Sequence, residues 1–144
     1  MQVPPRAGFK MDELAVNLIN GGGKVNFDGV QMSWNFADAK KPVRLGKRSK
    51  REFFDADKIG GRIVLRHWRA GDRFQPIGMK SAAKLQDLFT NQKIPRARRR
   101  DLVVAEAANG KIFWVQNLRM AEDFKVTPET KRCLVWRWRG CSLA

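Results

Sequence analysis

The side chains able to perform nucleophilic or acid–base catalysis are few and widely separated in this sequence. His67 is the only histidine, and no spacing ties it to a nucleophile. A serine or cysteine attacks only when an adjacent base activates it, and a lone imidazole beside a tryptophan is more often structural or exposed to solvent. Two acidic pairs also have simple explanations. Asp55 and Asp57 lie near a basic run that they can balance, and Glu122 and Asp123 fall in a predicted turn. The sequence therefore predicts no catalytic residue.

Metal and nucleotide sites are not predicted either. Cys133 and Cys141 are the only cysteines, and with one histidine they cannot provide the four ligands of a structural zinc site. We expect two reduced thiols, as in a cytosolic protein. The glycines at positions 21–23 precede Lys24, but Val25 stands where a phosphate-binding loop needs a hydroxyl, so we interpret the glycines as a helix stop. No metal and no cofactor is expected in this chain.

The composition is that of a globular protein with a strongly basic surface. The 144 residues, of which 43% are hydrophobic, suit one domain or one domain with a short appended element. Lys and Arg number 29 against 14 Asp and Glu, which gives a formal net charge of +15. Such a charge adds self-repulsion to the folded state. It points to a polyanion partner, most often nucleic acid, over a merely basic surface.

The sequence gives no sign of a membrane or secretory protein. No apolar run approaches the roughly 20 residues that span a bilayer, and the N-terminus lacks the apolar core of a signal peptide. An anionic membrane surface is a weaker candidate than nucleic acid, because no long basic amphipathic helix is present. We therefore expect a cytoplasmic protein with no membrane partner.

Two blocks of cations lie beside tightly specified backbone. The first surrounds a turn at Gly71 and Asp72, where the carboxylate is expected to accept backbone N–H groups. The second follows Pro95, on a helix too short for its arginines all to face one way, so some should be solvated or paired with acids such as Asp101. Cations near a helix N-terminus make a ready phosphate site. The first block comprises Arg69, Arg73, Lys80 and Lys84, and the second Arg96, Arg98, Arg99 and Arg100.

The elements that must hold these cations begin with a predicted helix over residues 11–19, where apolar side chains follow helical spacing. Residues 40–51 contain seven basic side chains. Such a run is usually a solvated loop, and an electrostatic arm or an unspecific nuclear-targeting signal is the alternative. Pro95 either starts a short helix or breaks the chain.

Strands are predicted mainly as hairpins. A two-residue turn that favours positive φ joins residues 25–27 to 30–36, and a second hairpin is predicted between residues 102–106 and 111–115. Residues 63–65 form a short apolar strand. Residues 133–139 alternate as a strand, with Leu134, Trp136 and Trp138 on one face. A capped turn is expected at Thr127. The turns of the two hairpins hold Asp28 with Gly29 and Asn109 with Gly110.

One longer helix is predicted after the first block of cations. Ser81 can cap it, and Leu85, Leu88 and Phe89 share one face. Phe74 and Phe89 are expected in the core, whereas Trp68 could either pack there or stack on a nucleic-acid base. The sum is an α+β fold, an antiparallel β-sandwich-like core of hairpins with a few short helices.

Several blocks together resemble the C-terminal domain of bacterial tRNA(Ile)-lysidine synthetase. The resemblance covers about residues 54–138. It is carried by residues 69–78, 84–89 and 93–95 with Arg99, and it continues through residues 112–115, Leu118 with Arg119, and residues 124–126.

The resemblance implies a fold shared with a domain of the phenylalanyl-tRNA synthetase β chain and a role in gripping the acceptor stem of tRNA, expected to be tRNA(Ile). It implies a separate ATP-pyrophosphatase domain, in cis or in trans, that uses ATP and Mg to convert the wobble cytidine to lysidine. The Ser-Gly-Gly-x-Asp-Ser loop of that domain is missing from these residues. A basic, non-catalytic module bound to RNA or the ribosome is the alternative.

The resulting expectations divide the chain and assign its side chains. Residues 1–23 are expected as a helical segment, the tail of a preceding domain, followed by the lysidine-synthetase-like domain at 24–139 and a tail at 140–144. The turn-forming residues are Gly71, Asp72, Phe74, Pro76 and Gly78. The tRNA-binding residues are Arg69, Arg73, Lys80, Lys84, Lys93, Arg96, Arg98, Arg99, Arg100, Arg119 and Lys125.

Overall fold

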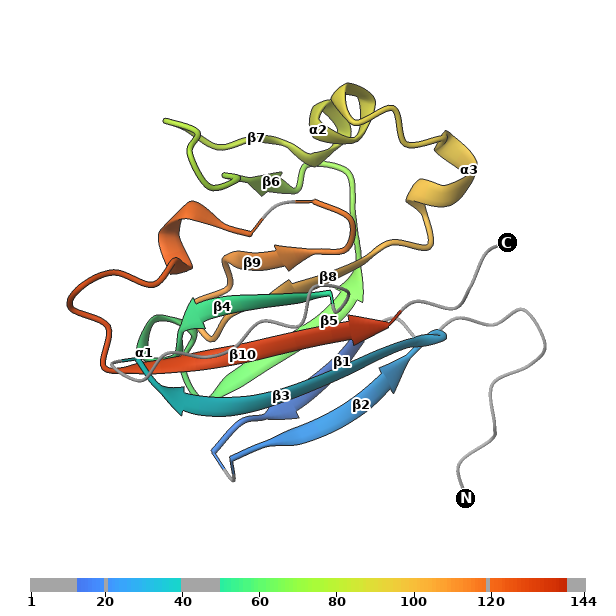
Figure 1. Ribbon diagram of the computed structural model, residues 1–144. Coiled ribbons are helices and arrows are strands. Elements are labelled where there is room, and N and C mark those ends of the chain that lie inside the picture. Colours follow the sequence, from blue (N-terminus) through green and yellow to red (C-terminus); the bar gives the residue numbers. More distant parts are fainter. Residues whose placement is uncertain (1–12, 20, 40–49, 119, 140–144) are drawn as a thin grey trace, which may run out of the picture.

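Two antiparallel β-sheets pack face to face, and a small ribbon with two helices lies beside them (Figure 1). The computed structural model describes residues 13–19, 21–39, 50–118 and 120–139. The basic run at residues 40–49 and the ends of the chain lie outside the described residues. None of the described helices is long and apolar enough to cross a membrane.

The first sheet has the order β1-β5-β8-β9, with every neighbouring pair antiparallel. The predicted strand at residues 63–65 and the predicted hairpin around Asn109 and Gly110 are confirmed, with a bulge between Ala105 and Glu106. Gly110 has φ +86°, as this turn requires. The strands are β1 Glu13–Asn17, β5 Arg62–His67, β8 Val103–Glu106 and β9 Ile112–Val115.

The helix predicted over residues 11–19 is wrong, because residues 13–17 form the strand β1. Leu14 lies opposite Leu65 and Val16 opposite Ile63. Leu14, Ala15, Leu18 and Ile19 fit a helical spacing, but Leu14, Val16 and Leu18 fit a period of two equally well, and pairing with β5 selects the strand.

The glycines after β1 are not a helix stop. Gly21 has φ +91° in the turn toward β2, and its carbonyl accepts a hydrogen bond from Nε1 of Trp34 at 3.1 Å. A Cβ on Gly22 would lie 2.9 Å from the Trp34 carbonyl oxygen, and one on Gly23 would lie 2.8 Å from the Trp34 ring. These glycines therefore allow the backbone to approach a core tryptophan closely.

The second sheet has the order β2-β3-β10-β4 and is also antiparallel. The hairpin predicted at Asp28 and Gly29 is confirmed, with φ +48° and +85° at its two turn residues. The strand predicted over residues 133–139 is also confirmed. The strands are β2 Gly23–Phe27, β3 Val30–Asp38, β4 Arg51–Asp55 and β10 Arg132–Arg139.

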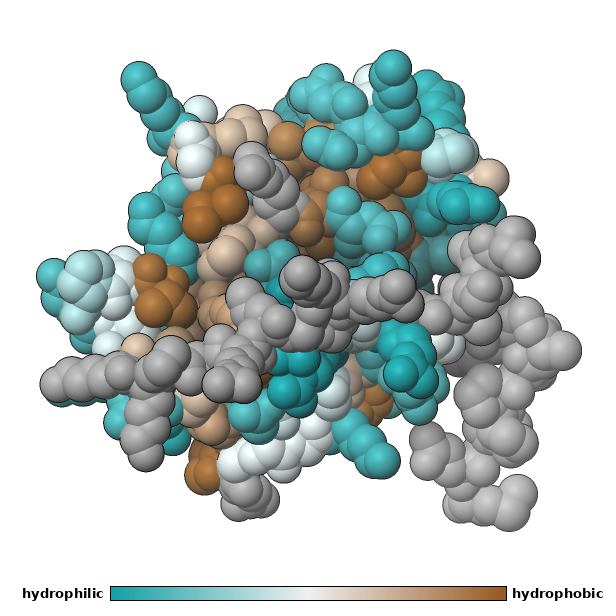
Figure 2. All heavy atoms as spheres, in the orientation of Figure 1, coloured by the Kyte–Doolittle hydropathy of each residue, from teal (hydrophilic) through white to brown (hydrophobic). Residues whose placement is uncertain are grey.

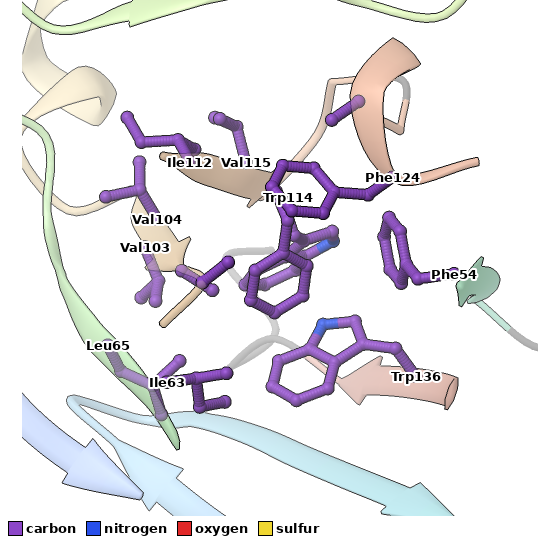
Figure 3. Close-up of a cluster of buried hydrophobic side chains, with 14 of the residues drawn as sticks. Phe54, Ile63, Leu65, Val103, Val104, Ile112, Trp114, Val115, Phe124 and Trp136 are labelled. Atoms are coloured by element: carbon purple, nitrogen blue, oxygen red, sulfur yellow. The ribbon is translucent and has the colours of Figure 1, made fainter. Parts of the chain in front are cut away.

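The core lies between the two sheets and is rich in aromatic rings (Figure 3). Phe113 of β9 contacts Phe54 of β4 and Trp136 of β10, with ring centroids 5.1 and 5.6 Å apart. Trp114 also meets Trp136 edge-on, at 5.6 Å. Edge-to-face contacts of this kind add stability beyond the area they bury, so these rings fix how the sheets pack together.

A ribbon and two helices form the third part, above β8 and β9 in Figure 1. The helix expected after Ser81 exists but begins at Leu85, and its N-cap position is Lys84 with no side-chain hydrogen bond. Ser81 is therefore not the cap. Pro95 precedes a helix rather than breaking the chain. The elements are β6 Arg73–Phe74, β7 Ala83–Lys84, α2 Leu85–Asn91 and α3 Arg96–Arg99.

Two short helical turns complete the fold, α1 Ala56–Ile59 and η1 Glu122–Phe124. Asp55 is buried and caps α1, where its carboxylate accepts from the backbone N–H groups of Asp57 and Lys58 and from Oγ1 of Thr130. It therefore stabilises local structure, whereas most of the basic run that it was expected to balance lies outside the described residues. The turn at Thr127 is confirmed, because Thr130 N donates to the carbonyl of Thr127 at 3.0 Å.

Candidate nucleic-acid interface

The turn between β5 and β6 is closed by Asp72. Its carboxylate accepts a hydrogen bond from the backbone N–H of Arg69 at 2.6 Å, and its own N–H donates to the Arg69 carbonyl at 3.0 Å. Gly71 has φ +93°, a conformation that favours glycine. The sequence prediction of a carboxylate-fixed turn is therefore confirmed.

The sequence did not single out Arg66, a buried side chain that stabilises this turn by pairing with Asp72. Its side chain is 5% exposed, and its guanidinium donates to both carboxylate oxygens of Asp72, at 2.9 and 3.0 Å, and to the His67 carbonyl at 3.0 Å. It also pairs with Glu106. Burial disfavours its charge, but the hydrogen bonds that Arg66 donates to Asp72 and Glu106, together with their negative charges, outweigh burial and raise the pKa of Arg66. No local motif marks such an arginine, because one of its partners lies on another strand.

Exposed cations lie on and next to the turn that Asp72 and Arg66 stabilise. The Arg69 side chain is 57% exposed, with Nη2 3.5 Å from the Glu13 carboxylate. Arg73 lies directly opposite Lys84 in the β6–β7 ribbon. Like charges in this position repel each other, and Nη2 of Arg73 donates to the Ala82 carbonyl at 3.1 Å. Lys80 is exposed in the loop of the ribbon. A phosphate between these side chains would relieve the repulsion.

The second block of cations is divided, as the short helix led us to expect. Arg96, Arg98 and Arg100 are exposed, whereas Arg99 is half-buried and its Nε donates to the Ile94 carbonyl at 2.8 Å. Arg99 therefore supports the connection between α2 and α3. Lys93 is exposed in that connection, with φ +57°.

Two predicted tRNA-binding residues remain, Lys125 and Arg119. Lys125 pairs with Glu122, whose carboxylate also accepts from the Gly78 N–H at 2.9 Å. The hydrogen bond from Lys125, and then the one from Gly78, hold the pKa of Glu122 below its ordinary value. The charge of Lys125 is thus largely neutralised in place. Arg119 lies outside the described residues.

The other turn-forming residues hold the ribbon on the sheets. Phe74 is buried, Pro76 forms a bridge with Ala121, and Gly78 has φ +89°. These positions agree with their predicted structural role.

His67 proves to be structural. Its Nε2 lies 2.5 Å from the Asp28 carboxylate and its Nδ1 lies 3.2 Å from the Leu102 carbonyl oxygen. It therefore joins the tip of the β2–β3 hairpin to the first sheet. Among the described residues no group of three or more His, Cys, Asp and Glu could hold a metal ion.

The exposed cations all come from one stretch of the chain, residues 69–100. Residues 68–100 contain nine Lys and Arg and only two Asp, one of which is paired with Arg66. Hydrophilic side chains gather over α2 and α3 in Figure 2. The basic face is defined here as Arg69, Arg73, Lys80, Lys84, Lys93, Arg96, Arg98 and Arg100.

The aromatic rings near the basic face point into the protein. Phe74 and Phe89 are buried, which confirms their predicted place in the core. Trp68 is half-buried and meets Phe89 edge-on at 5.3 Å, so the open question about Trp68 is resolved in favour of packing. The arrangement can therefore bind phosphate groups, and the buried rings of Phe74 and Phe89 are not available for base stacking.

Comparison with known proteins gives one consistent family. A family model described as TilS substrate C-terminal domain matches residues 63–138. The tRNA(Ile)-lysidine synthase of Clostridium acetobutylicum is 40% identical over 94 residues, which cover 65% of this chain and 20% of that protein. That of Clostridium tetani is 36% identical over 128 residues, 89% of this chain and 26% of that protein. The chain thus spans about a fifth to a quarter of these relatives.

Two solved structures share the fold. The crystal structure of a TILS C-terminal domain has a TM-score of 0.65 at 23% identity and covers 80% of this chain and 87% of that one. An N-terminal fragment of the phenylalanyl-tRNA synthetase β-subunit from Pyrococcus horikoshii has a TM-score of 0.51 at 20% identity, covering 67% of this chain and 30% of that one. The predicted fold class is therefore confirmed.

Proposed function

The chain belongs to the family of TilS substrate C-terminal domains, and on this premise we propose that it is the tRNA-binding part of a tRNA(Ile)-lysidine synthetase. The basic face is the observation that carries this proposal. It places exposed cations on the turn before β6, on the β6–β7 ribbon and on the segment from Lys93 through α3, while Phe74 and Phe89 anchor the ribbon and α2 to the core. An anchored set of cations suits a polyanion of fixed shape better than a flexible one.

We further propose that the acceptor stem is gripped through its phosphates. The side chains of the basic face are arginines and lysines, and the nearby rings are packed inward. Double-stranded RNA is bound mainly through its backbone and shape. Selection of tRNA(Ile) would then depend on the shape of the stem or on a second, catalytic part of the enzyme.

The chemistry itself belongs, in this proposal, to an ATP-pyrophosphatase domain in cis or in trans, where ATP and Mg serve the conversion of the wobble cytidine to lysidine. The described residues do not fit these groups, because they provide no cluster of acidic ligands and the sequence holds no phosphate-binding loop. The chain would work in the cytoplasm, as a part of the ligase without catalytic residues of its own.

The proposal is tested by titrating tRNA(Ile) and an unrelated DNA duplex of the same length with the 144-residue chain across a salt series. Binding should be tighter to the tRNA, and log Kd should rise linearly with log salt, by about 0.7–0.9 for each phosphate neutralised. Equal affinities with equal slopes for both ligands would refute tRNA recognition. A lysate partner that survives nuclease treatment would instead favour a protein or ribosomal docking site.

Single variants refine the test. Arg73→Ala should weaken tRNA binding and reduce the salt slope by about one phosphate, with little change in melting temperature. Arg99→Ala should mainly lower the melting temperature, because Arg99 supports the Ile94 carbonyl. The reverse pattern would place Arg99, and not Arg73, on the RNA.

A further inference from the structure

An acidic side chain inside a surface that binds an anion needs an explanation. Asp72 immediately precedes Arg73 and lies within the turn that carries Arg69. By Coulomb's law a carboxylate at this position opposes the approach of phosphate. If Asp72 acted only through its charge, the basic face would bind RNA better without it.

The contacts of Asp72 suggest a different role. Its side chain is 13% exposed, and both carboxylate oxygens accept hydrogen bonds from the buried guanidinium of Arg66. One of them also accepts from the backbone N–H of Arg69 at 2.6 Å. The negative charge is therefore largely compensated from inside the protein, and little of it reaches the RNA side.

The backbone of Asp72 also connects this turn to the β6–β7 ribbon and the start of α2. Its carbonyl accepts from the N–H of Leu85 at 2.9 Å, at the start of α2. Lys84 directly precedes Leu85, and Arg73 directly follows Asp72. A single residue thus fixes the backbone at three cations of the basic face, namely Arg69, Arg73 and Lys84.

We propose that Asp72 is a positioning residue for RNA binding: held by Arg66, it sets the spacing of Arg69, Arg73 and Lys84, so that its removal weakens binding although it removes a negative charge. This inference rests on the proposed function. Preorganised cations bind a rigid partner more tightly than the same cations on a loose loop, because less order is lost on binding.

The test is the affinity of Asp72→Asn for tRNA(Ile) at fixed salt, with Glu106→Gln as the matched control. Both changes remove a carboxylate that contacts Arg66, but Glu106 lies on β8 and holds no part of the turn. We expect Asp72→Asn to bind about tenfold more weakly, the loss on the order of one well-placed phosphate contact, and Glu106→Gln to bind as the unaltered chain does. Tighter binding by Asp72→Asn, or equal losses in both variants, would overturn the inference.

Gly71→Ala is a second, independent test of the proposal, because it changes the turn without changing any charge. Nothing lies within 4 Å of the added Cβ, so only the positive φ of +93° opposes the change. It should weaken binding in the same direction, while melting curves of all variants report whether the fold survives. Undiminished binding by Gly71→Ala would count against a geometric role. If the unaltered chain does not bind tRNA, the proposed function itself fails, and the two failures are therefore distinguishable.

Discussion

Arg66 contacts two carboxylates and a backbone carbonyl while its side chain is only 5% exposed. Each of these contacts compensates the buried charge of Arg66. Removing one partner of a buried ion pair is strongly destabilising, because it leaves the other charge buried without compensation. Among the described residues it links β5, β8 and the turn that carries the first cations.

Arg66→Met should therefore destabilise the protein by about 3 kcal/mol, because it leaves Asp72 and Glu106 facing each other without their cation. Urea unfolding followed by tryptophan fluorescence measures the change. Arg62→Met on the same strand is the control, since Arg62 is exposed, and it should change the unfolding free energy by less than about 0.5 kcal/mol. Equal effects of the two variants would contradict the role given to Arg66.

Glu122 allows a prediction in pH. The pKa of Glu122 is lowered in the folded state, chiefly by the hydrogen bond from Lys125. A lowered folded-state pKa means that the carboxylate stabilises the fold above its unfolded pKa and loses this effect as the pH falls through the folded value. NMR titration of the side-chain carboxyl should give a midpoint below that of an ordinary glutamate, and Lys125→Met should raise it. A midpoint unchanged by Lys125→Met would exclude Lys125 as the main cause.

At the scale of elements, the hairpins were predictable because their turn chemistry is local. Asp28 and Gly29 both adopt positive φ, and Gly110 does so after Asn109, so the residue types at these turns mark the hairpins from the local sequence alone. β1 was not predictable in this way, because its apolar residues fit a helix and a strand equally well. The decision depends on β5, which lies far along the chain.

In the candidate site, too, features set by the local sequence could be predicted, whereas those set by contacts far along the chain could not. Gly71 and Asp72 could be assigned to a turn from sequence, and the burial of Phe74 followed from its size and type. The roles of Arg66 and Arg99 could not, because their partners are a carboxylate on β8 and a main-chain carbonyl. Composition places cations on a surface, but only the fold separates those that face solvent from those that support the backbone.

The helix α2 depends on one aromatic contact more than on helix propensity. Phe89 is fully buried and meets Trp68 edge-on, and α2 has no side-chain cap. Phe89→Ala should lower the unfolding free energy by about 3–5 kcal/mol. Gln86→Ala on the exposed side of α2 should change it little. Chemical denaturation of both variants checks this, and a small effect of Phe89→Ala would mean that α2 is held by other contacts.

For the molecule as a whole, a net charge of +15 must be accommodated within 144 residues. Repulsion among exposed cations destabilises the compact state, and salt screens it. Raising NaCl from 0.1 to 1 M shortens the Debye length from about 10 Å to about 3 Å.

The melting temperature should consequently rise by a few °C over that range, on the order of 1 kcal/mol. Differential scanning fluorimetry measures it. A melting temperature that falls with salt would mean that attractive ion pairs such as those of Arg66 outweigh the repulsion.

The position of β10 has a consequence for how the protein is made. β10 is the last of the described strands in the chain, yet it lies between β3 and β4 at the centre of its sheet. During translation β3 and β4 leave the ribosome long before the strand that joins them, so the nascent chain carries unpaired edges on β3 and β4 until β10 has been made. The sheet formed by β1, β5, β8 and β9 has all of its strands earlier, and it should fold first while the second sheet closes last around β10.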